Sequence, residues 1–386
     1  MVSSNAYSRL LEPPQKSFFL FGLRGSGKST WARDHFREAP RIDLLDERLY
    51  QDLILHPEFF TTPLESLPPG AWVVVDEIQR IPGLLNYVHK YIEERRLKFV
   101  LLGSSSRKLR QAGVNLLGGR ALLRHMYPFV PAELGPHFDL ERVLRYGSIP
   151  IIWNEPQPEQ SLEAYVQLFM RDEIRAEALV RNFPAFARFF PTVALMHGQT
   201  INVSSLSRDS GVARSTLIDH LNVLEDTHMI YQLPAFETRL RVRERKQPKL
   251  YWVDPGLVRA AAGRRGAVGH EERGPLFEGW IASLLRVYGE YRGLFDSMAY
   301  WSPHGSRVEV DFVLRRGQDL LAIEVKSAER VQPEHLKGLR AMGELPEVRR
   351  RILIYNGRYA LKTEDGIEEW PVATFLAALA GDSLWP

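Results

Sequence analysis

The stretch that decides the fold is Gly22-Leu23-Arg24-Gly25-Ser26-Gly27-Lys28-Ser29. It satisfies the pattern G-x-x-x-x-G-K-[ST] at every fixed position. The mainly apolar residues at 17–21 precede it and are typical of a buried strand, and residues 30–36 have the composition of a helix. Glycines in such a loop let backbone N–H groups surround phosphate oxygens at the positive end of a helix. The stretch therefore predicts a site for the phosphates of a nucleotide.

The side chains of this loop and of the residue after it have separable roles. Lys28 is expected to act in catalysis by reaching the β- and γ-phosphates of ATP, and the hydroxyl of Ser29 is expected to bind Mg²⁺. ATP and Mg²⁺ are therefore the expected cofactors. The other residues expected to line the nucleotide are Gly22, Arg24, Gly25, Ser26, Gly27 and Thr30.

Two carboxylates follow a second apolar run. Residues 72–75 are apolar and are followed by Asp76 and Glu77, which is typical of a central parallel strand that delivers acids at its C-terminal edge. Hydrolysis of the γ-phosphate needs a metal-orienting carboxylate and a group that activates water. We therefore expect Asp76 to hold Mg²⁺ through water and Glu77 to polarise the attacking water.

Four further segments can be compared with known families: Asp76-Glu77-Ile78-Gln79-Arg80, Pro82-Gly83-Leu84-Leu85, Gly103-Ser104-Ser105-Ser106 and the turn from Leu117 to Arg120. Through them the chain resembles a widespread family of bacterial and archaeal AAA-type P-loop ATPases. Proteins of this family carry an ATPase domain followed by a C-terminal domain of endonuclease-like fold, and they generally lack an assigned biochemical role. The similarity extends over essentially the whole chain, so it implies an architecture more firmly than an activity.

The resemblance implies further nucleotide-site residues. In AAA-like ATPases, the strand beside the metal-carboxylate strand ends in a small polar residue that orients the water, and Ser104 or Ser105 after the apolar run at 98–102 fits this role. A run of serines is also a common helix N-cap, so both interpretations stay open. Arg120 is the candidate arginine finger, which would neutralise transition-state charge on a neighbouring subunit. Arg124 and Arg80 compete with it, and a surface ion pair is the ordinary alternative.

The middle of the chain predicts two helical modules. Residues 128–195 are expected to form a helical lid over the nucleotide, in which Arg171 and Arg175 would either touch the nucleotide or face solvent. Residues 201–221 have helix-turn-helix spacing with the turn at Gly211. The apolar face of this motif is Leu206, Val212, Leu217, Leu221 and Leu224.

Basic residues gather around and after this motif. The second helix begins with Arg214, Ser215 and Thr216, which suit base edges or phosphates. A strand after it would place alternate arginines on one exposed face, as in a winged helix that contacts duplex or branched DNA. A packing or protein-binding module is the alternative. The expected basic stripe runs from Arg239 to Arg245. The basic residues of the whole segment are Arg239, Arg241, Arg243, Arg245, Lys246 and Lys249, opposed by Glu237 and Glu244.

Residues 308–326 predict a hairpin with strict alternation. Glu309 and Asp311 share one face of its first strand, and Glu324 and Lys326 share one face of its second. This arrangement is similar to the D…E-x-K signature of the PD-(D/E)xK nuclease fold. The resemblance implies that Asp311 and Glu324 bind one or two Mg²⁺ ions, that Lys326 positions or deprotonates water, and that Glu278 on an upstream helix adds an acid. Cross-strand salt bridges have the same appearance, and such folds are also retained as DNA-binding or structural platforms.

Length and composition fit two or three globular domains. The chain has 386 residues, no cysteine and a formal net charge of +3, so disulfides and thiolate chemistry are excluded. No signal peptide or membrane span is evident, and a cytoplasmic protein without membrane contact is expected. The expected α/β fold comprises a P-loop AAA-type ATPase core (1–127), a helical lid (128–195), a winged helix (196–247) and a PD-(D/E)xK nuclease-like α/β domain (248–386).

The leading hypothesis is an ATP-hydrolysing, DNA-processing protein that forms a homo-oligomer, such as a ring, and cuts or grips DNA through Asp311, Glu324 and Lys326. An alternative is a nucleotide-switched DNA-binding regulator whose nuclease-like domain is catalytically silent. A small-molecule P-loop kinase is a third hypothesis, which the helix-turn-helix motif and the acidic hairpin disfavour.

Overall fold

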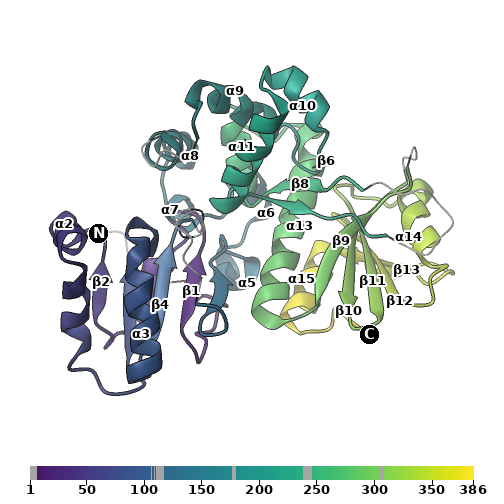
Figure 1. Cartoon of the computed structure of the whole chain (residues 1–386). Helices are drawn as coiled ribbons and strands as arrows, with labels where there is room; N and C mark the ends of the chain where they lie inside the picture. Colours follow the sequence, from purple (N-terminus) through teal and green to yellow (C-terminus); the bar gives the residue numbers. More distant parts are fainter. Residues whose placement is uncertain are drawn as a thin grey trace. The chain divides into compact units, whose positions relative to one another are not determined.

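The computed structural model describes residues 7–105, 107, 109, 117–175, 180–237, 246–304 and 308–386. The chain divides into two compact units, and each is built around sheets of its own (Figure 1). Unit 1 contains the residues up to 128 together with 149–151 and 223–229. Unit 2 contains 129–148, 152–222 and 230–386.

Unit 1 is organised by a five-stranded parallel sheet with the strand order β2-β3-β4-β1-β5. Its central strands are continuous apolar runs, as expected for parallel strands covered on both faces. Because β4 lies between β1 and β3, the loops that follow these three strands share one edge of the sheet. The strands are β1 (Phe18–Phe21), β2 (Arg41–Asp43), β3 (Trp72–Asp76), β4 (Lys98–Gly103) and β5 (Leu122–His125).

Helices alternate with these strands, which confirms the predicted α/β class of this part of the chain. The strands predicted before the glycine-rich loop, before Asp76 and before Ser104 are all present. Asp46 caps the second helix by accepting hydrogen bonds from the N–H groups of Arg48 and Leu49. The helices are α1 (Lys28–His35), α2 (Glu47–Leu55) and α3 (Leu85–Arg95), with 3₁₀ turns η1 (Pro57–Leu64), η2 (Ile78–Arg80) and η3 (Pro82–Leu84).

The segment from 128 to 195 is largely helical, as its apolar spacing predicts. Its last helix is the most strongly amphipathic, and it buries Phe186, Phe189 and Phe190. The elements are α5 (Pro131–Leu134), η4 (Gly135–His137), α6 (Leu140–Tyr146), α7 (Pro150–Trp153), α8 (Pro158–Leu168), the π-helix η5 (Phe169–Arg175) and α9 (Phe183–Ala194).

Two helices and three short strands follow. Helix α10 (Val203–Ser210) ends at Gly211, whose φ of 65° is left-handed, and α11 (Arg214–Asp226) follows it. The five apolar residues predicted for the face of this motif are all buried. The strands form an antiparallel sheet in the order β6-β8-β7. They are β6 (Gln199–Thr200), β7 (Ile230–Leu233) and β8 (Lys249–Trp252).

The predicted basic stripe from Arg239 to Arg245 cannot be placed. Arg239, Arg241, Arg243 and Arg245, and the opposing Glu244, lie outside the described residues. Lys246 is exposed and forms an ion pair with Glu237. The strand β8 lies beyond the expected limit at 247/248, yet it is the central strand of the sheet that includes β6 and β7.

A six-stranded mixed sheet forms the other part of unit 2, with the order β13-β14-β12-β11-β10-β9. The predicted hairpin is present, because β10 pairs antiparallel with β11 and Arg316 lies opposite Asp319. Helices α13 and α15 lie beside this sheet (Figure 1). The strands are β9 (Ser297–Trp301), β10 (Val310–Arg316), β11 (Asp319–Lys326), β12 (Val348–Tyr355), β13 (Leu361–Lys362) and β14 (Glu368–Pro371).

Five further helical elements complete unit 2. The longest is α13, which spans 23 residues. Across the part of the chain that the structure describes, none of the helices combines the length and the apolar character that crossing a bilayer requires. The elements are α12 (Pro255–Ala261), α13 (His270–Arg292), η6 (Pro333–Leu336), α14 (Lys337–Met342) and α15 (Val372–Ala380).

The two sheets of unit 2 are joined by backbone pairing. Ala235, just after β7, forms a parallel bridge with Tyr300 of β9. The N–H of Phe236 donates to the carbonyl of Tyr300 at 2.6 Å, and the N–H of Tyr300 donates to Pro234 at 3.0 Å. As a consequence, strand β8 lies near one end of the β10–β11 hairpin.

A buried carboxylate fixes the chain just after β8. Asp254 is 0 % exposed and caps α12 by accepting from the N–H of Leu257 at 3.2 Å. Its other oxygen accepts from the N–H of Ser148 at 2.7 Å. Burial raises the pKa of Asp254 from 3.8 to about 7, although these N–H groups act in the opposite direction.

This shift predicts a pH-dependent stability. Because the pKa of Asp254 is higher in the folded state, its contribution to stability is complete at low pH and is lost as the pH rises through about 7. Asp254→Asn is expected to remove this loss. The free energy of unfolding of the variant should gain roughly 4 kcal/mol relative to wild type between about pH 4 and pH 8. Urea denaturation across this range checks it, and equal pH dependences would contradict the assignment.

Candidate nucleotide site and acidic cluster

The glycine-rich loop occupies the turn between β1 and α1. Gly25 and Gly27 have left-handed φ values of 74° and 92°, which side chains other than glycine rarely adopt. A Cβ on Gly25 would lie 2.5 Å from Cγ2 of Ile151. The helix begins directly at Lys28, so its first N–H groups face the loop. The loop therefore has the backbone cradle that the sequence predicts for a phosphate group.

The side chains of the glycine-rich loop and of Thr30 differ in their exposure to solvent. Lys28 is buried, and its Nζ donates to the carbonyls of Gly22 and Leu23 at 2.8 and 2.9 Å. Ser29 is half-buried, whereas Arg24 and Thr30 are exposed. Ser26 is fully buried. The expected contacts of Lys28 with phosphate and of Ser29 with metal stay predictions.

Arg9 is a cation at this loop that sequence reasoning missed. Its guanidinium donates to the carbonyls of Ser26 and Tyr127 at 2.8 and 2.5 Å. A Cβ on Gly27 would lie 3.5 Å from the same guanidinium. Arg9 belongs to no motif and reaches the loop only through the fold, so no pattern in the sequence indicates it.

The two carboxylates lie where the sequence predicts them, at the end of β3. Asp76 is the last residue of the strand, and its Oδ1 accepts from the N–H of Glu77 at 3.0 Å. Glu77 has a left-handed φ of 56°. Such a conformation is costly for a residue with a side chain and is concentrated at functional sites.

A buried glutamine joins this carboxylate to the neighbouring strand. Nε2 of Gln79 donates to the carboxylate of Glu77 and to Oγ of Ser104 at 3.2 Å. A Cβ on Gly103 would lie 2.5 Å from Oε1 of Gln79. Gln79 therefore connects the ends of β3 and β4, a role that the sequence alone did not indicate.

The two serines after β4 make different contacts. Ser104 is buried, and its Oγ accepts from Nε2 of Gln79. Oγ of Ser105 instead accepts from the N–H of Arg107 at 3.2 Å, which is the contact of a local cap. Nη1 of Arg107 lies 3.0 Å from Oδ2 of Asp226, the last residue of α11.

The candidate arginine fingers contact their own subunit. Arg120 forms an exposed ion pair with Glu93. Arg80 donates to the carbonyl of Leu44 and lies 4.0 Å above the ring of Tyr50. Among the other arginines considered, Arg124 donates to the carbonyl of Leu123, Arg171 pairs with Asp172, and Arg175 lies over Phe183. A finger that acts on another subunit stays a prediction.

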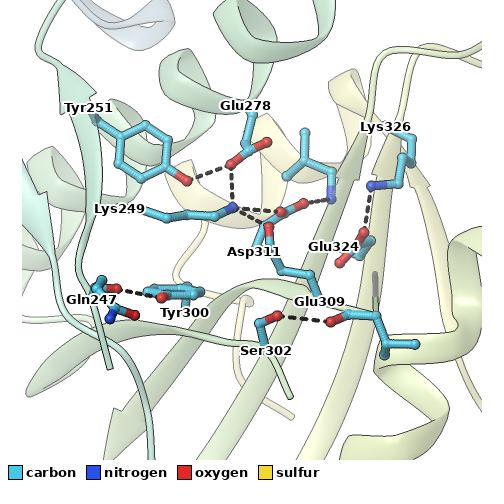
Figure 2. A network of polar contacts seen from close by, with 12 residues as sticks. Gln247, Lys249, Tyr251, Glu278, Tyr300, Ser302, Glu309, Asp311, Glu324 and Lys326 are labelled. Atoms are coloured by element: carbon cyan, nitrogen blue, oxygen red, sulfur yellow. Dashed lines mark hydrogen bonds and ion pairs between the residues drawn. The ribbon is translucent and has the colours of Figure 1, made fainter. Parts of the chain in front are cut away.

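The second group of candidate residues gathers in unit 2, as Figure 2 shows. Glu278 comes from α13, Glu309 directly precedes β10, and Asp311 lies on β10. One carboxylate oxygen of each lies within 4.8 Å of the others. We call these three residues the acidic cluster. The structure thus brings the predicted Glu278 and Asp311 together and adds Glu309.

The predicted Glu324 and Lys326 lie beside the acidic cluster on β11 and pair with each other. Nζ of Lys326 is 2.5 Å from Oε1 of Glu324. The N–H of Val325, between them, donates to Oδ2 of Asp311 at 2.9 Å. Oε2 of Glu324 is buried and has no hydrogen-bond partner in the described part of the chain.

Lys249 lies inside the acidic cluster (Figure 2). Its Nζ is 2.9 Å from Oε1 of Glu278 and 3.3 Å from Oδ1 of Asp311, and it also pairs with Glu309. Its side chain is only 3 % exposed. Lys249 was counted among the basic residues that follow the helix-turn-helix motif, but it is not available to DNA, because the face of β8 that carries it packs against acids.

The environment shifts the pKa values of the acids in different directions. Burial raises the pKa of Glu309 to about 7 and raises those of Glu278 and Glu324 as well. Burial also acts to raise the pKa of Asp311, but the charges of Lys249 and Lys326 outweigh it and lower that pKa. Asp311 is accordingly the acid that stays ionised most readily.

The contacts of the three carboxylates decide whether the acidic cluster can bind the predicted Mg²⁺. Three carboxylates at this spacing suit a hard divalent cation such as Mg²⁺. The ammonium of Lys249, however, already contacts all three carboxylates. A divalent ion bound by the same oxygens would be strongly repelled by it. With Lys249 in place the acidic cluster does not fit a divalent metal, and the predicted set of Glu278, Asp311 and Glu324 stays a prediction.

Comparisons with known proteins match the chain in three parts. A family model described as an AAA domain matches residues 14–135. Two domains of unknown function match the remainder, DUF8612 at 137–267 and DUF4143 at 273–375. An uncharacterized protein of Haemophilus influenzae is 25 % identical, covering 95 % of this chain and 96 % of that protein. One of Mycobacterium tuberculosis is 22 % identical, covering 95 % and 82 %.

Two solved structures are distantly similar. The ORC1 protein of Aeropyrum pernix, solved in complex with DNA, is 14 % identical with a TM-score of 0.30, covering 65 % of this chain and 87 % of that one. A signal transduction ATPase with a tetratricopeptide repeat sensor from Pyrococcus horikoshii is 13 % identical with a TM-score of 0.26, covering 70 % and 43 %. At these scores neither likeness defines the fold.

Proposed function

We propose that this chain, which carries an AAA-type P-loop ATPase domain at residues 14–135, hydrolyses ATP and uses the nucleotide to control binding to DNA. The proposal that the chain hydrolyses ATP is supported by one observation. The glycine-rich loop, Asp76 with Glu77, and Ser104 follow three neighbouring strands at one edge of a parallel sheet. Gln79 joins Glu77 to Ser104 at that edge.

Each residue then has a role in hydrolysis. Lys28 holds the β- and γ-phosphates, and Ser29 and Asp76 hold the Mg²⁺ that accompanies ATP. Glu77 accepts a proton from the attacking water, while Ser104 helps to orient that water. Mg²⁺ neutralises charge that develops on the phosphate oxygens. Arg120 of a neighbouring subunit completes the site in a homo-oligomer such as a ring, as the sequence predicts.

The DNA part of the proposal rests on residues 196–247 as a winged helix. Arg214 and Ser215, at the start of α11, are exposed, whereas the apolar face of the motif is buried. This distribution suits a helix whose first turn contacts phosphates or base edges. Residues 128–195 act as the helical lid in this proposal, and 248–386 as a PD-(D/E)xK nuclease-like domain.

Arg214→Ala tests the DNA contact. Because a phosphate-contacting arginine contributes through counterion release, the variant should bind duplex DNA several-fold more weakly and with a shallower salt dependence. Fluorescence anisotropy at several salt concentrations measures both, on duplex and on four-way junction DNA. Arg188→Ala, in α9, is the matched control. Equal affinities and salt slopes for Arg214→Ala and wild type would contradict the assigned contact.

A second candidate function, a nucleotide-switched regulator with a silent nuclease-like domain, is favoured by two observations. Lys249 occupies the acidic cluster, which disfavours metal-dependent cleavage. The ion pair between Arg107 and Asp226 links the segment after Ser105 to the end of α11. Both side chains are mostly buried, at 18 % and 14 % exposure, so the pair is less screened by solvent than a surface pair.

Arg107→Ala is expected to uncouple DNA binding from the state of the bound nucleotide. The variant should hydrolyse ATP and bind DNA, but the ratio of its DNA affinities with ATP and with ADP should fall close to one. Asp226→Asn should have the same effect, and the double variant no more, because both changes remove one ion pair. Arg37→Ala, an exposed arginine of unit 1, is the control. If Arg107→Ala kept the wild-type ratio of DNA affinities with ATP and with ADP, this ion pair would not couple the nucleotide to DNA binding.

A further inference from the structure

Lys249 is held more rigidly than a surface lysine. It lies on the central strand β8, opposite Thr200 of β6 and Leu233 of β7. Its ammonium lies 5.6 Å from the centroid of the Tyr300 ring. The hydroxyl of Tyr300 in turn donates to the carbonyl of Gln247 at 2.5 Å. The backbone around Lys249 is therefore fixed on both sides before its side chain makes any contact.

The hydrogen-bonding capacity of the Lys249 ammonium is fully used. An ammonium has three N–H donors, and Nζ contacts one carboxylate each of Glu278, Glu309 and Asp311. Tyr251, two residues along the same face of β8, donates to the same oxygen of Glu278 at 2.5 Å. The contacts of this amine are thus with acids from two separate elements, α13 and the start of β10 (Figure 2).

The neighbouring lysine does not compete for this position. Lys326 is engaged by Glu324 at 2.5 Å. The acids that face Lys249 from the elements packed around it are Glu278, Glu309 and Asp311. Tyr251, Glu324 and Lys326 are other titratable groups that act on the acidic cluster or on Lys249. Each lysine therefore has its own carboxylate partners.

We infer that Lys249 is a tethered cation that occupies the position a divalent metal would take between Glu278, Glu309 and Asp311. The native acidic cluster then binds no divalent cation and instead fastens β8 to the six-stranded sheet through charge. Removal of the Lys249 ammonium opens a three-carboxylate site for a hard divalent cation. This inference goes beyond the proposed function, because it holds whether or not the chain binds DNA.

Binding of Mn²⁺ to the full-length, nucleotide-free chain tests the inference. Electron paramagnetic resonance of free Mn²⁺ gives the stoichiometry and affinity directly. Wild type is expected to show no site that depends on Asp311. Lys249→Met should gain one site with at least about tenfold higher affinity than any that wild type shows, and Asp311→Asn in this background should remove it. Lys246→Met, which removes an exposed lysine three residues away, should behave like wild type.

Two results would overturn the inference. One is a Mn²⁺ site in wild type that Asp311→Asn abolishes. The other is a folded Lys249→Met variant, with native circular dichroism, that gains no site.

A measurement on wild type keeps the test independent of folding in the variant. Reductive methylation followed by mass spectrometry reports the accessibility of each amine. Lys249 should stay unmodified with and without millimolar Mn²⁺, while Lys246, which is 77 % exposed, should react readily. If Mn²⁺ makes Lys249 reactive, the ammonium leaves the acidic cluster when metal arrives, and the inference fails.

Discussion

Replacing Glu77 by Gln is expected to lower ATP turnover by at least about 100-fold while ATP still binds. Glutamine keeps the size of the side chain but cannot accept a proton from the attacking water. The position follows β3 directly, and Gln79 contacts the carboxylate that the change removes. Because Lys28 and the loop backbone are untouched, the affinity for ATP should change only a few-fold. Phosphate release measures the turnover, and a fluorescent ATP analogue measures binding.

Two companion variants make this result specific. Glu94→Gln removes an exposed acid of α3 that pairs only loosely with Lys90, at 4.0 Å, and should retain wild-type turnover. Lys28→Ala should lose ATP binding itself, because the phosphates lose their cation. Native turnover in Glu77→Gln would mean that another group activates the water.

Gly147→Ala is expected to destabilise the fold by about 3 to 5 kcal/mol, the range of severe single substitutions. Gly147 has a left-handed φ of 73°, and a Cβ there would lie 1.8 Å from Oδ1 of Asp254. The side chain of Asp254 cannot easily move away, because it is buried and accepts hydrogen bonds from the N–H groups of Ser148 and Leu257. The free energy of unfolding from urea denaturation measures the loss.

Gly263→Ala separates the clash with Asp254 from the backbone cost of placing a residue with a side chain at a positive φ. Gly263 has nearly the same φ, 68°, but apart from the glycine and its two chain neighbours no heavy atom of the described chain lies within 4 Å of the position that a Cβ would take there. This control should therefore show only the backbone cost of about 1 kcal/mol. Similar losses in both variants would contradict the proposed clash with Asp254.

The positions of the candidate nucleotide-site residues in the fold were largely predictable because the sequence signals are local. The glycine-rich loop and the acids after an apolar run each occupy consecutive residues, and parallel strands deliver their C-terminal ends to one edge. The same short-range patterns predict the α/β class and the strands at 17–21, 72–77 and 98–102. They also predict the hairpin with its turn at 316–319, where Arg316 and Asp319 prove to be the last paired residues.

Residues that act through long-range contacts could not be predicted. Arg9 reaches Tyr127 over 118 positions, and Gln79 reaches Ser104 over 25. Neither belongs to a motif, and each contact depends on which strands are neighbours in the sheet. Gln79 stood within the segment that resembles the ATPase family, but its neighbours gave no indication that its side chain turns inward.

Lys249 shows why charge and proximity in the sequence can mislead. It was grouped with the basic residues from Arg239 to Lys246 because of its charge and its place in the chain. Strand β8 begins only at Lys249, and its partners Glu278 and Asp311 lie 29 and 62 positions away. The period of a strand indicates which residues share a face, whereas the sheet and its packing decide what that face contacts.

The central claim, that nucleotide controls binding to DNA, is tested most directly by the DNA affinity of the Glu77→Gln chain with ATP and with ADP. This variant should hold ATP without consuming it, so each nucleotide state can be measured at equilibrium. We predict affinities for duplex or four-way junction DNA that differ by at least about fivefold between the two states. Equal affinities, or no binding to either DNA at low salt, would contradict the account.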